Sequence, residues 1–214
     1  MNPVSASGPS NTLFPVFVKL ENIRVLVVGG GAVGLEKLRA LLSNAPQARV
    51  TLVAAQICPD IRSLAAAHDY LELKERAFSP CDLLGKDLII AATNDCDLHL
   101  QIRDMAKAQH ILINVADTPE LCDFYLGSIV SKGQVKIAIS TNGKSPTVAK
   151  RLRELLSDLI PDEMDELLDR LGILRSRLKG DFAQKVRRLN ELTEMLVLKG
   201  GDSNPDKGEG PVSL

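Results

Sequence analysis

Three glycines in the first part of the chain have the spacing that dinucleotide binding requires. Gly29, Gly31 and Gly34 match the pattern G-x-G-x-x-G, between an apolar run at residues 25–28 and a helical pattern at residues 32–42. The first such glycine allows a sharp bend, the second lets backbone approach a pyrophosphate, and the third lets helix and strand pack closely. The pattern predicts a dinucleotide site, with a purely structural glycine turn as the alternative. A P-loop is not favoured, because no Lys-Ser or Lys-Thr follows the last glycine.

A carboxylate near the middle of the chain is the second candidate for chemistry. Asp117 lies in the run NVADTPE at residues 114–120, directly after an apolar stretch that is predicted to be a strand. The carboxyl end of a strand in a parallel sheet faces the ligand crevice, so Asp117 would point toward the cofactor. Carboxylates before a turn also bond local backbone. On the pattern alone, both catalysis and local capping stay open for Asp117.

The cysteines and histidines do not predict a metal centre. The four cysteines are widely spaced, without a C-x-x-C pair, and the three histidines form no cluster with them. We therefore predict reduced, partly buried thiols and no zinc site.

Alternating strand and helix patterns must position these residues. Strands are predicted at residues 13–20, 25–28, 48–54, 70–76, 87–93 and 111–116, and helices at residues 32–42, 57–68 and 97–109. Strands that alternate with helices form a parallel sheet with right-handed crossovers. We therefore predict an α/β fold with a Rossmann-like domain at residues 13–118, after a flexible leader at residues 1–12. The first strand contains Pro15 and suits the edge of a sheet.

The second strand of the nucleotide-binding pattern departs from the usual rule. An acidic residue is expected about 20 residues after the glycines, where it holds the ribose hydroxyls. This chain has Ala54, Ala55 and Gln56 there. The acid rule therefore does not decide between NAD and NADP.

The pattern changes after residue 118. Alternating residues at 124–131 and 134–140 flank Lys132-Gly133 and predict a β-hairpin, in a region of residues 119–145. Ser145 and Pro146 suit the N-cap and first position of a helix that runs to residue 159. Helical periodicity continues to residue 198 with an interruption at Gly180-Asp181, so a helical domain is predicted at residues 146–199. A disordered tail is predicted at residues 200–214.

Composition sets the outer limits. The 214 residues are 45% hydrophobic and 25% charged, with a formal net charge of −1, which disfavours both disorder and general nucleic-acid binding. Aromatic residues make up 3% with no tryptophan, so base-stacking platforms are not expected. No apolar stretch reaches the ~18 residues that span a bilayer, and no secretory signal is recognised. We expect a cytoplasmic protein without nucleic-acid or membrane partners.

Four motifs, in order, resemble a known enzyme family. They are FPVFVKLENIRVLVVGGGAVGLEK, LIIAATND, INVADTPELCDF and IAISTNGKSPTVAKRLR, and the likeness runs over residues 14–161. In this stretch the chain is similar to the precorrin-2 dehydrogenase and sirohydrochlorin ferrochelatase family, the N-terminal module of siroheme synthases. The helical end of the chain is a weaker match.

The resemblance implies a function and most of a site. It implies a homodimer, with NAD bound by the Rossmann-like domain, the hairpin at the dimer interface, and the helical part helping to cover a tetrapyrrole. Precorrin-2 would be oxidised to sirohydrochlorin by hydride transfer to NAD, and many members then insert ferrous iron, a substrate, to give siroheme. The family's catalytic aspartate falls on Asp117. The implied cofactor contacts are Gly29, Gly31, Ala32, Val33, Gly34, Ala55, Gln56 and Thr93.

Basic residues near the helix that follows Ser145 suit the many carboxylates of such a substrate, because cations and helix N-termini both favour anions. An ordinary solvated helix face is the alternative for each of them. The predicted substrate contacts are Asn114, Lys144, Ser145, Lys150 and Arg151.

Some family members have Ser-Ser-Gly-Gly before that helix, with a second serine that can be phosphorylated. This chain has Ser140-Thr141-Asn142-Gly143, and phosphorylation of Thr141 stays open.

Three functions stay open on the sequence. The first is an enzyme with both the dehydrogenase and the chelatase step, and the second is a dehydrogenase only. The third is a regulatory module that binds NAD without catalysis. Such modules commonly carry an acid after the second strand, which this chain lacks.

Overall fold

The chain divides into two compact units. One comprises Met1–Ser128 with Ile139–Lys150, and the other Ile129–Ala138 with Arg151–Leu214. The structure is a computed structural model that describes residues 11–162, 164–177, 183–184 and 186–191.

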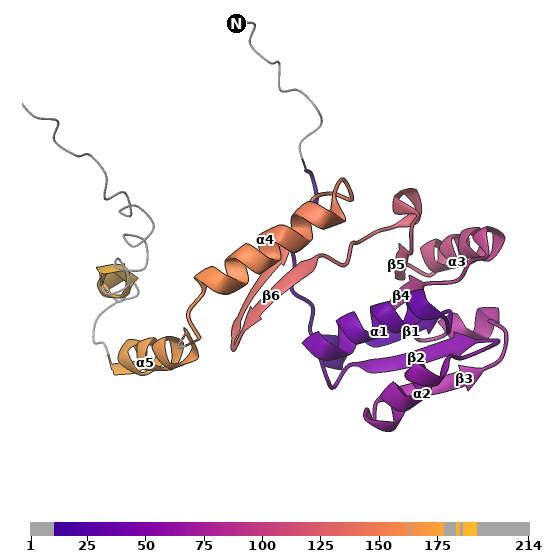
Figure 1. Cartoon of the computed structure of the whole chain (residues 1–214), viewed down its shortest axis with the longest axis horizontal. Helices are drawn as coiled ribbons and strands as arrows, with labels where there is room; N and C mark the ends of the chain where they lie inside the picture. Colours follow the sequence, from indigo (N-terminus) through magenta and orange to yellow (C-terminus); the bar gives the residue numbers. More distant parts are fainter. Residues whose placement is uncertain (1–10, 163, 178–182, 185, 192–214) are drawn as a thin grey trace, which may run out of the picture. The chain divides into compact units, whose positions relative to one another are not determined.

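A five-stranded parallel sheet forms the centre of the first unit (Figure 1). Its strands are β1 (Arg24–Val28), β2 (Arg49–Ala54), β3 (Leu71–Glu75), β4 (Leu88–Ala91) and β5 (Leu112–Val115). Their order is β3-β2-β1-β4-β5, and every pair is parallel. The order reverses between β1 and β4, and open α/β sheets bind their ligands at such a switch point, outside the carboxyl ends of the strands.

Helices bury both faces of this sheet, which is why its central strands are continuous apolar runs. Leucines of α1 (Ala32–Asn44) and Ile61 of α2 (Pro59–Ala66) share one core cluster with Val25 and Val27. On the other face, Ile102 of α3 (Cys96–Ala108) packs in a second cluster with Leu26. Phe78 and Met105 pack against that second cluster.

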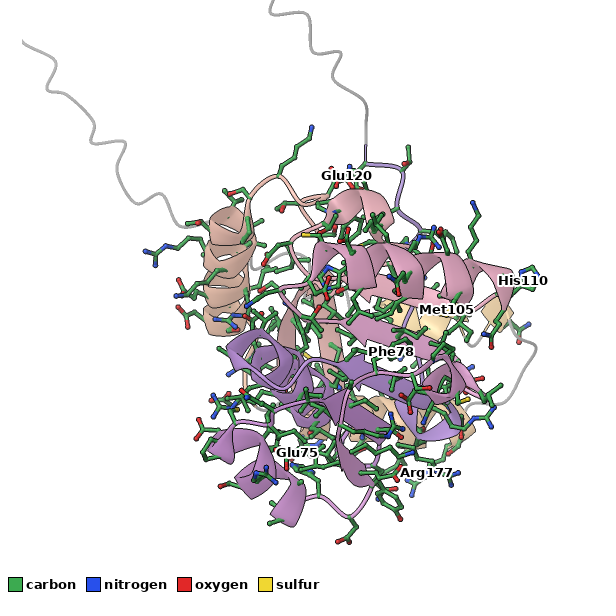
Figure 2. All side chains as sticks on the ribbon, turned by 90° about the vertical axis from the view of Figure 1, so that its right-hand side faces the viewer. Glu75, Phe78, Met105, His110, Glu120 and Arg177 are labelled. Carbon is green, nitrogen blue, oxygen red and sulfur yellow. The ribbon has the colours of Figure 1, made fainter. Side chains whose placement is uncertain are left out.

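The carboxyl ends of all five strands lie on one side of the sheet, because every neighbouring pair is parallel. Glu75 is the last residue of β3, and Glu120 belongs to η3 (Pro119–Leu121), which follows β5. Figure 2 labels both of them to the left of His110, which precedes β5.

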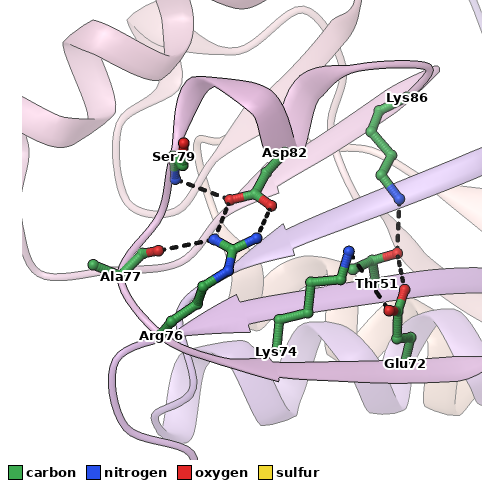
Figure 3. Close-up of polar contacts among 8 residues, drawn as sticks. All are labelled: Thr51, Glu72, Lys74, Arg76, Ala77, Ser79, Asp82 and Lys86. Atoms are coloured by element: carbon green, nitrogen blue, oxygen red, sulfur yellow. Dashed lines mark hydrogen bonds and ion pairs between the residues drawn. The ribbon is translucent and has the colours of Figure 1, made fainter.

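The crossover from β3 to β4 contains η2 (Pro80–Leu83) in place of an α-helix. Ser79 and Asp82 form a capping box there, and the Arg76 guanidinium donates to both carboxylate oxygens of Asp82 at 2.8 and 2.5 Å (Figure 3). This bond to Arg76 lowers the pKa of Asp82. Beside it, Lys86 Nζ donates to Thr51 Oγ1 at 2.7 Å. Polar contacts thus cover this part of the sheet face.

The predicted strands and helices of the Rossmann-like fold are confirmed, with one exception. The strand predicted at residues 13–20 is wrong: residues 11–19 have no regular structure, and η1 (Leu20–Asn22) follows them. The alternating pattern is present, but Phe14 and Phe17 are 86% and 71% exposed and Pro15 has no N–H to donate. A pattern of alternation cannot form a strand without a partner strand.

The predicted hairpin is confirmed as β6 (Ser128–Lys132) and β7 (Val135–Ile139), with Gly133 in its turn at φ +55°. The first strand begins later than residue 124, because residues 122–124 bond to the edge of β5 instead. Beyond the turn, Gln134 N–H donates to Asp165 Oδ1 at 2.6 Å.

The helical segment begins with α4 (Pro146–Leu159). Ser145 Oγ accepts the Val148 N–H at 3.2 Å, which confirms the predicted N-cap. After it come α5 (Met164–Arg177) and helical residues 183–184 and 186–191. The predicted break at Gly180-Asp181, the tail at residues 200–214 and residues 1–10 of the leader lie outside the described residues. Within the part that is described, no helix combines the length and apolarity needed to cross a bilayer.

Candidate functional site

The glycine turn after β1 is shaped by close backbone contacts. Gly29 has φ +125°, and a Cβ on it would lie 2.2 Å from the Ala92 carbonyl oxygen at the end of β4. A Cβ on Gly34 would lie 2.2 Å from the Gly29 carbonyl oxygen. Side chains are therefore excluded at both positions, which bring β1, β4 and α1 together. Gly30 is equally restricted, since its Cβ would lie 2.2 Å from the Gln56 carbonyl oxygen, and the motif did not single it out.

Gly31 differs from the other glycines of the turn. A Cβ on it would meet no atom within 4 Å. Gly31 is also the N-cap of α1, where no side chain caps the helix, and Ala32 after it is exposed. An exposed helix N-terminus with open space at its cap fits a pyrophosphate, because the first N–H groups and the helix dipole attract anions.

The loop after β2 packs against this turn. Cys58 N–H donates to the Gly30 carbonyl oxygen at 2.9 Å. Ala55 and Gln56, two of the predicted cofactor contacts, are exposed in this loop. The structure therefore brings them next to the glycine turn, at the carboxyl edge of the sheet.

Thr93 follows β4 and comes directly after Ala92, whose carbonyl oxygen faces Gly29 of the glycine turn. Its hydroxyl oxygen is 2.9 Å from His99 Nε2 and accepts the Asp95 N–H at 3.2 Å. His99 is buried, and burial lowers its pKa, while the nearby Asp95 carboxylate opposes that shift. A buried, mainly neutral imidazole thus fixes the Thr93 hydroxyl. The sequence reasoning missed His99, for which the only signal is its place six residues after Thr93 on the predicted helix.

Asp117 lies in a tight turn directly after β5. Its backbone is left-handed, with φ +57°, a conformation that is uncommon for residues other than glycine and that clusters at functional sites. Asp117 itself is exposed. The Thr118 N–H donates to the Val115 carbonyl oxygen at 3.4 Å and closes the turn.

Cys122 forms hydrogen bonds to residues before and after Asp117 and so holds the Asp117 turn. Its Sγ accepts the Val115 N–H at 3.2 Å and is close enough to donate to the carbonyl oxygens of Val115 and Thr118, at 3.2 and 3.4 Å. Burial raises the pKa of this thiol, so it stays protonated and able to donate. The next residue, Asp123, exchanges hydrogen bonds with Ile113 at 2.8 and 3.1 Å. We call residues 122–124 the return segment.

The five predicted substrate contacts lie in different surroundings. Asn114 is buried in β5, and its amide donates to the Phe124 carbonyl oxygen at 2.8 Å, so it holds the return segment. Lys144 and Lys150 are exposed around the start of α4, and Ser145 caps that helix. Arg151 belongs to the second compact unit and pairs with Glu154 at 2.9 Å. Their roles toward a substrate stay predictions.

No group of three or more His, Cys, Asp or Glu side chains that could hold a metal ion occurs among the described residues. The cysteines there are free thiols.

The sheet order and the glycine turn define a Rossmann-type dinucleotide-binding protein. Residues 16–128 match a family model described as putative NAD(P)-binding, and residues 132–159 match one described as sirohaem biosynthesis protein central. The chain therefore belongs to this NAD(P)-binding family, within the group that contains siroheme synthases and precorrin-2 dehydrogenase.

Individual relatives agree with this placement. The siroheme synthase of Thioalkalivibrio sulfidiphilus is 40% identical over 148 residues, which are 69% of this chain and 30% of that protein. The siroheme synthase of Pseudoalteromonas translucida is 40% identical over 168 residues, 78% of this chain and 35% of that protein. This chain thus spans about a third of the length of these relatives. A solved structure of SirC, precorrin-2 dehydrogenase, is similar with a TM-score of 0.64 at 28% identity, over 84% of this chain and 89% of that one.

Proposed function

We propose that this chain oxidises precorrin-2 to sirohydrochlorin with NAD as the hydride acceptor, a step of siroheme biosynthesis. One observation carries the proposal: an open glycine turn and an exposed, left-handed Asp117 follow strands at the same carboxyl edge of one sheet. The similarity to SirC, precorrin-2 dehydrogenase, over most of both chains supports the choice of substrate.

The residues of this chain have separate tasks in the proposed reaction. NAD, when bound, supplies the acceptor for the hydride. Gly31 and the first N–H groups of α1 would hold its pyrophosphate, and Thr93 would contact its nicotinamide end. Asp117 would take the proton that leaves the substrate as the hydride departs. The remaining proposed cofactor contacts are Gly29, Ala32, Val33, Gly34, Ala55 and Gln56.

The substrate's carboxylates would bind to cationic and hydroxyl groups near the start of α4. Lys144 and Lys150 are exposed there, where the helix N-terminus adds to the attraction of anions. The full proposed set is Asn114, Lys144, Ser145, Lys150 and Arg151.

A second step, the insertion of ferrous iron into sirohydrochlorin, belongs to the same proposal. Iron is a substrate of that step, and Asp117 would accept the pyrrole protons that the metal displaces. Two relatives carry the name siroheme synthase, which favours this step. Two alternatives remain: a dehydrogenase without chelatase activity, and a module that binds NAD without catalysis.

The test is anaerobic incubation of the purified chain with precorrin-2 and NAD, with and without ferrous iron, followed by absorbance spectroscopy. Formation of sirohydrochlorin only with NAD supports the dehydrogenase. Siroheme formed faster than in a protein-free control supports the chelatase. Binding of NAD without any spectral change of precorrin-2 would contradict both enzymatic steps and favour the regulatory module.

A homodimer and a cytoplasmic location complete the proposal. The helix α4 exposes an apolar stripe at helical spacing, formed by Val148, Leu152, Leu155 and Leu159, and such a face suits a second copy of the chain. Light scattering that shows only monomer at high concentration would contradict the dimer.

A further inference from the structure

The cofactor choice of this chain is not explained by the usual acidic residue. In Rossmann folds an acid at the end of β2 binds the ribose 2′-hydroxyl of NAD, whereas a nearby arginine accommodates the 2′-phosphate of NADP. This chain has Ala55 and Gln56 after β2, and its family model covers both cofactors. A group that makes this distinction in this chain therefore comes from another element.

Glu75 brings a carboxylate to this place from the neighbouring strand. It is the last residue of β3, and it is the register partner of Ala54, the last residue of β2. Its Oε1 accepts the Ile57 N–H at 3.3 Å. Because Ile57 follows Gln56 directly, the carboxylate lies beside the loop where the missing acid would be.

That loop also contacts the glycine turn. The Gln56 carbonyl oxygen lies 2.2 Å from the position that a Cβ of Gly30 would take. The Cys58 N–H donates to the Gly30 carbonyl oxygen at 2.9 Å. A continuous set of contacts therefore joins Glu75, the loop after β2 and the turn that would bind the pyrophosphate.

Arg62 favours the ionised form of this carboxylate. Its Nη2 donates to Glu75 Oε1 at 2.5 Å, and this bond lowers the pKa of Glu75. The Glu75 side chain is 43% exposed, so it is also within reach of a ligand at the edge of the sheet. An ionised carboxylate accepts hydrogen bonds from hydroxyls and repels phosphates.

We propose that Glu75 is the specificity-determining residue that selects NAD over NADP, by accepting the ribose 2′-hydroxyl and repelling a 2′-phosphate. The inference rests on the proposed function only in requiring that the chain binds a dinucleotide. Arg62 contributes to this selection in a second way. Its guanidinium is paired with Glu75 and is therefore not available to bind a 2′-phosphate.

The test is the isosteric substitution Glu75→Gln, with NAD and NADP binding measured by calorimetry on the full chain. The amide oxygen of glutamine still accepts the Ile57 N–H, so the loop keeps its support while the charge is lost. Because the charged acceptor of the ribose hydroxyl is replaced by a neutral amide, NAD affinity should fall about tenfold. NADP affinity should stay equal or rise, since the repulsion is gone and Arg62 is released.

Glu72→Gln is the matched control. Glu72 lies on the same strand and its loss changes the net charge equally, but it lies near Thr51 and Lys74, at 3.3 and 3.5 Å, away from the carboxyl end of β3 (Figure 3). The ratio of NAD to NADP affinity should not change in this variant. Should the glutamine variant prove too unstable to purify, Glu75→Ser tests the affinity ratio alone. Serine also removes the acceptor of the Ile57 N–H, so both affinities can fall, but NAD affinity should fall by the larger factor.

An unchanged ratio of NAD to NADP affinity in Glu75→Gln would overturn the inference. If both affinities fall by the same factor, Glu75 only supports the loop, and if neither changes, Glu75 does not contact the cofactor. In either case the wild-type chain still binds NAD and the proposed function stands, whereas a wild-type chain that binds neither dinucleotide would refute the proposed function and this inference together.

Discussion

Two turns at the carboxyl ends of the strands of one sheet differ in what fixes their shape. The glycine turn after β1 can form only without side chains, because a Cβ at Gly29, Gly30 or Gly34 would lie 2.2 Å from a carbonyl oxygen. The Asp117 turn after β5 depends on side chains, since Cys122 of the return segment bonds back to Val115, and the Asn114 amide of β5 holds that segment through the Phe124 carbonyl oxygen. The turn proposed to bind the pyrophosphate thus offers backbone alone, whereas the turn of the proposed catalytic carboxylate is held in place by side chains.

The largest effect should follow from changing Asp117 itself. Asp117→Asn keeps the size and the turn-forming character of the residue but removes the proton acceptor, and a general base contributes about 10²-fold or more to a rate. NAD-dependent oxidation of precorrin-2 should fall by at least that factor, while NAD affinity measured by calorimetry stays unchanged. A variant with full turnover would remove Asp117 from the catalytic role and leave its turn a structural one.

Within the glycine turn, two alanine substitutions should have different consequences. Gly34→Ala places a Cβ against the Gly29 carbonyl oxygen and should lower the free energy of unfolding by about 2 kcal/mol, the range of overpacked sites. Gly31→Ala meets no atom within 4 Å and should lower the free energy of unfolding by less than Gly34→Ala does, since only the poorer N-cap preference of alanine opposes it. It should weaken NAD binding about tenfold, or 1.4 kcal/mol, because the methyl group fills the space for the pyrophosphate.

Chemical denaturation and calorimetry on the same samples separate these two effects. If both variants lost stability equally, the distinction between packing glycines and the ligand-facing glycine would be wrong.

The Asp117 turn should respond to the loss of the Cys122 thiol. Cys122→Ala removes the bonds to Val115 and leaves buried polar groups unpaired, which costs about 1–3 kcal/mol. Turnover should fall several-fold without a change in NAD affinity, because the carboxylate turn loosens while the glycine turn does not. Cys122→Ser should recover part of the rate, and Cys81→Ala, at an exposed cysteine, should do nothing. Equal rates for all three variants would show that the thiol does not position the turn.

The smallest expected effect is a loss of stability at alkaline pH. Burial raises the pKa of Cys122 in the folded chain, so the unfolded chain loses its thiol proton first as pH rises. The contribution of the thiol is therefore fully present below the ordinary thiol pKa, ~8.5, and is lost as pH rises through the raised folded value. Melting temperatures of the wild type should fall more over this range than those of Cys122→Ala, and parallel curves would contradict the assignment.

The sequence could predict the features that depend on neighbouring residues, but not those that depend on contacts with residues elsewhere in the chain. The glycine motif and the apolar or alternating patterns of the five strands depend on local spacing, so both were predictable from neighbouring residues. The positions of Gly30, His99 and Cys122 depend on partners elsewhere, as when Gly30 meets Gln56 or Cys122 bonds back to Val115. Residues 13–20 show the reverse case, in which a local alternation predicted a strand but no strand in the described part of the chain pairs with these residues.

The return segment also protects the end of the sheet from other chains. In β5, Ile113 and Val115 carry the N–H and C=O groups that face away from β4, and Asp123 and Cys122 bond to all four of them. An unpaired edge strand is a template for aggregation, because another strand can add to it. Here the Asp123 and Cys122 side chains and the Asp123 N–H take up the groups that a foreign strand would need, so the segment that holds the Asp117 turn also blocks the addition of another strand at β5.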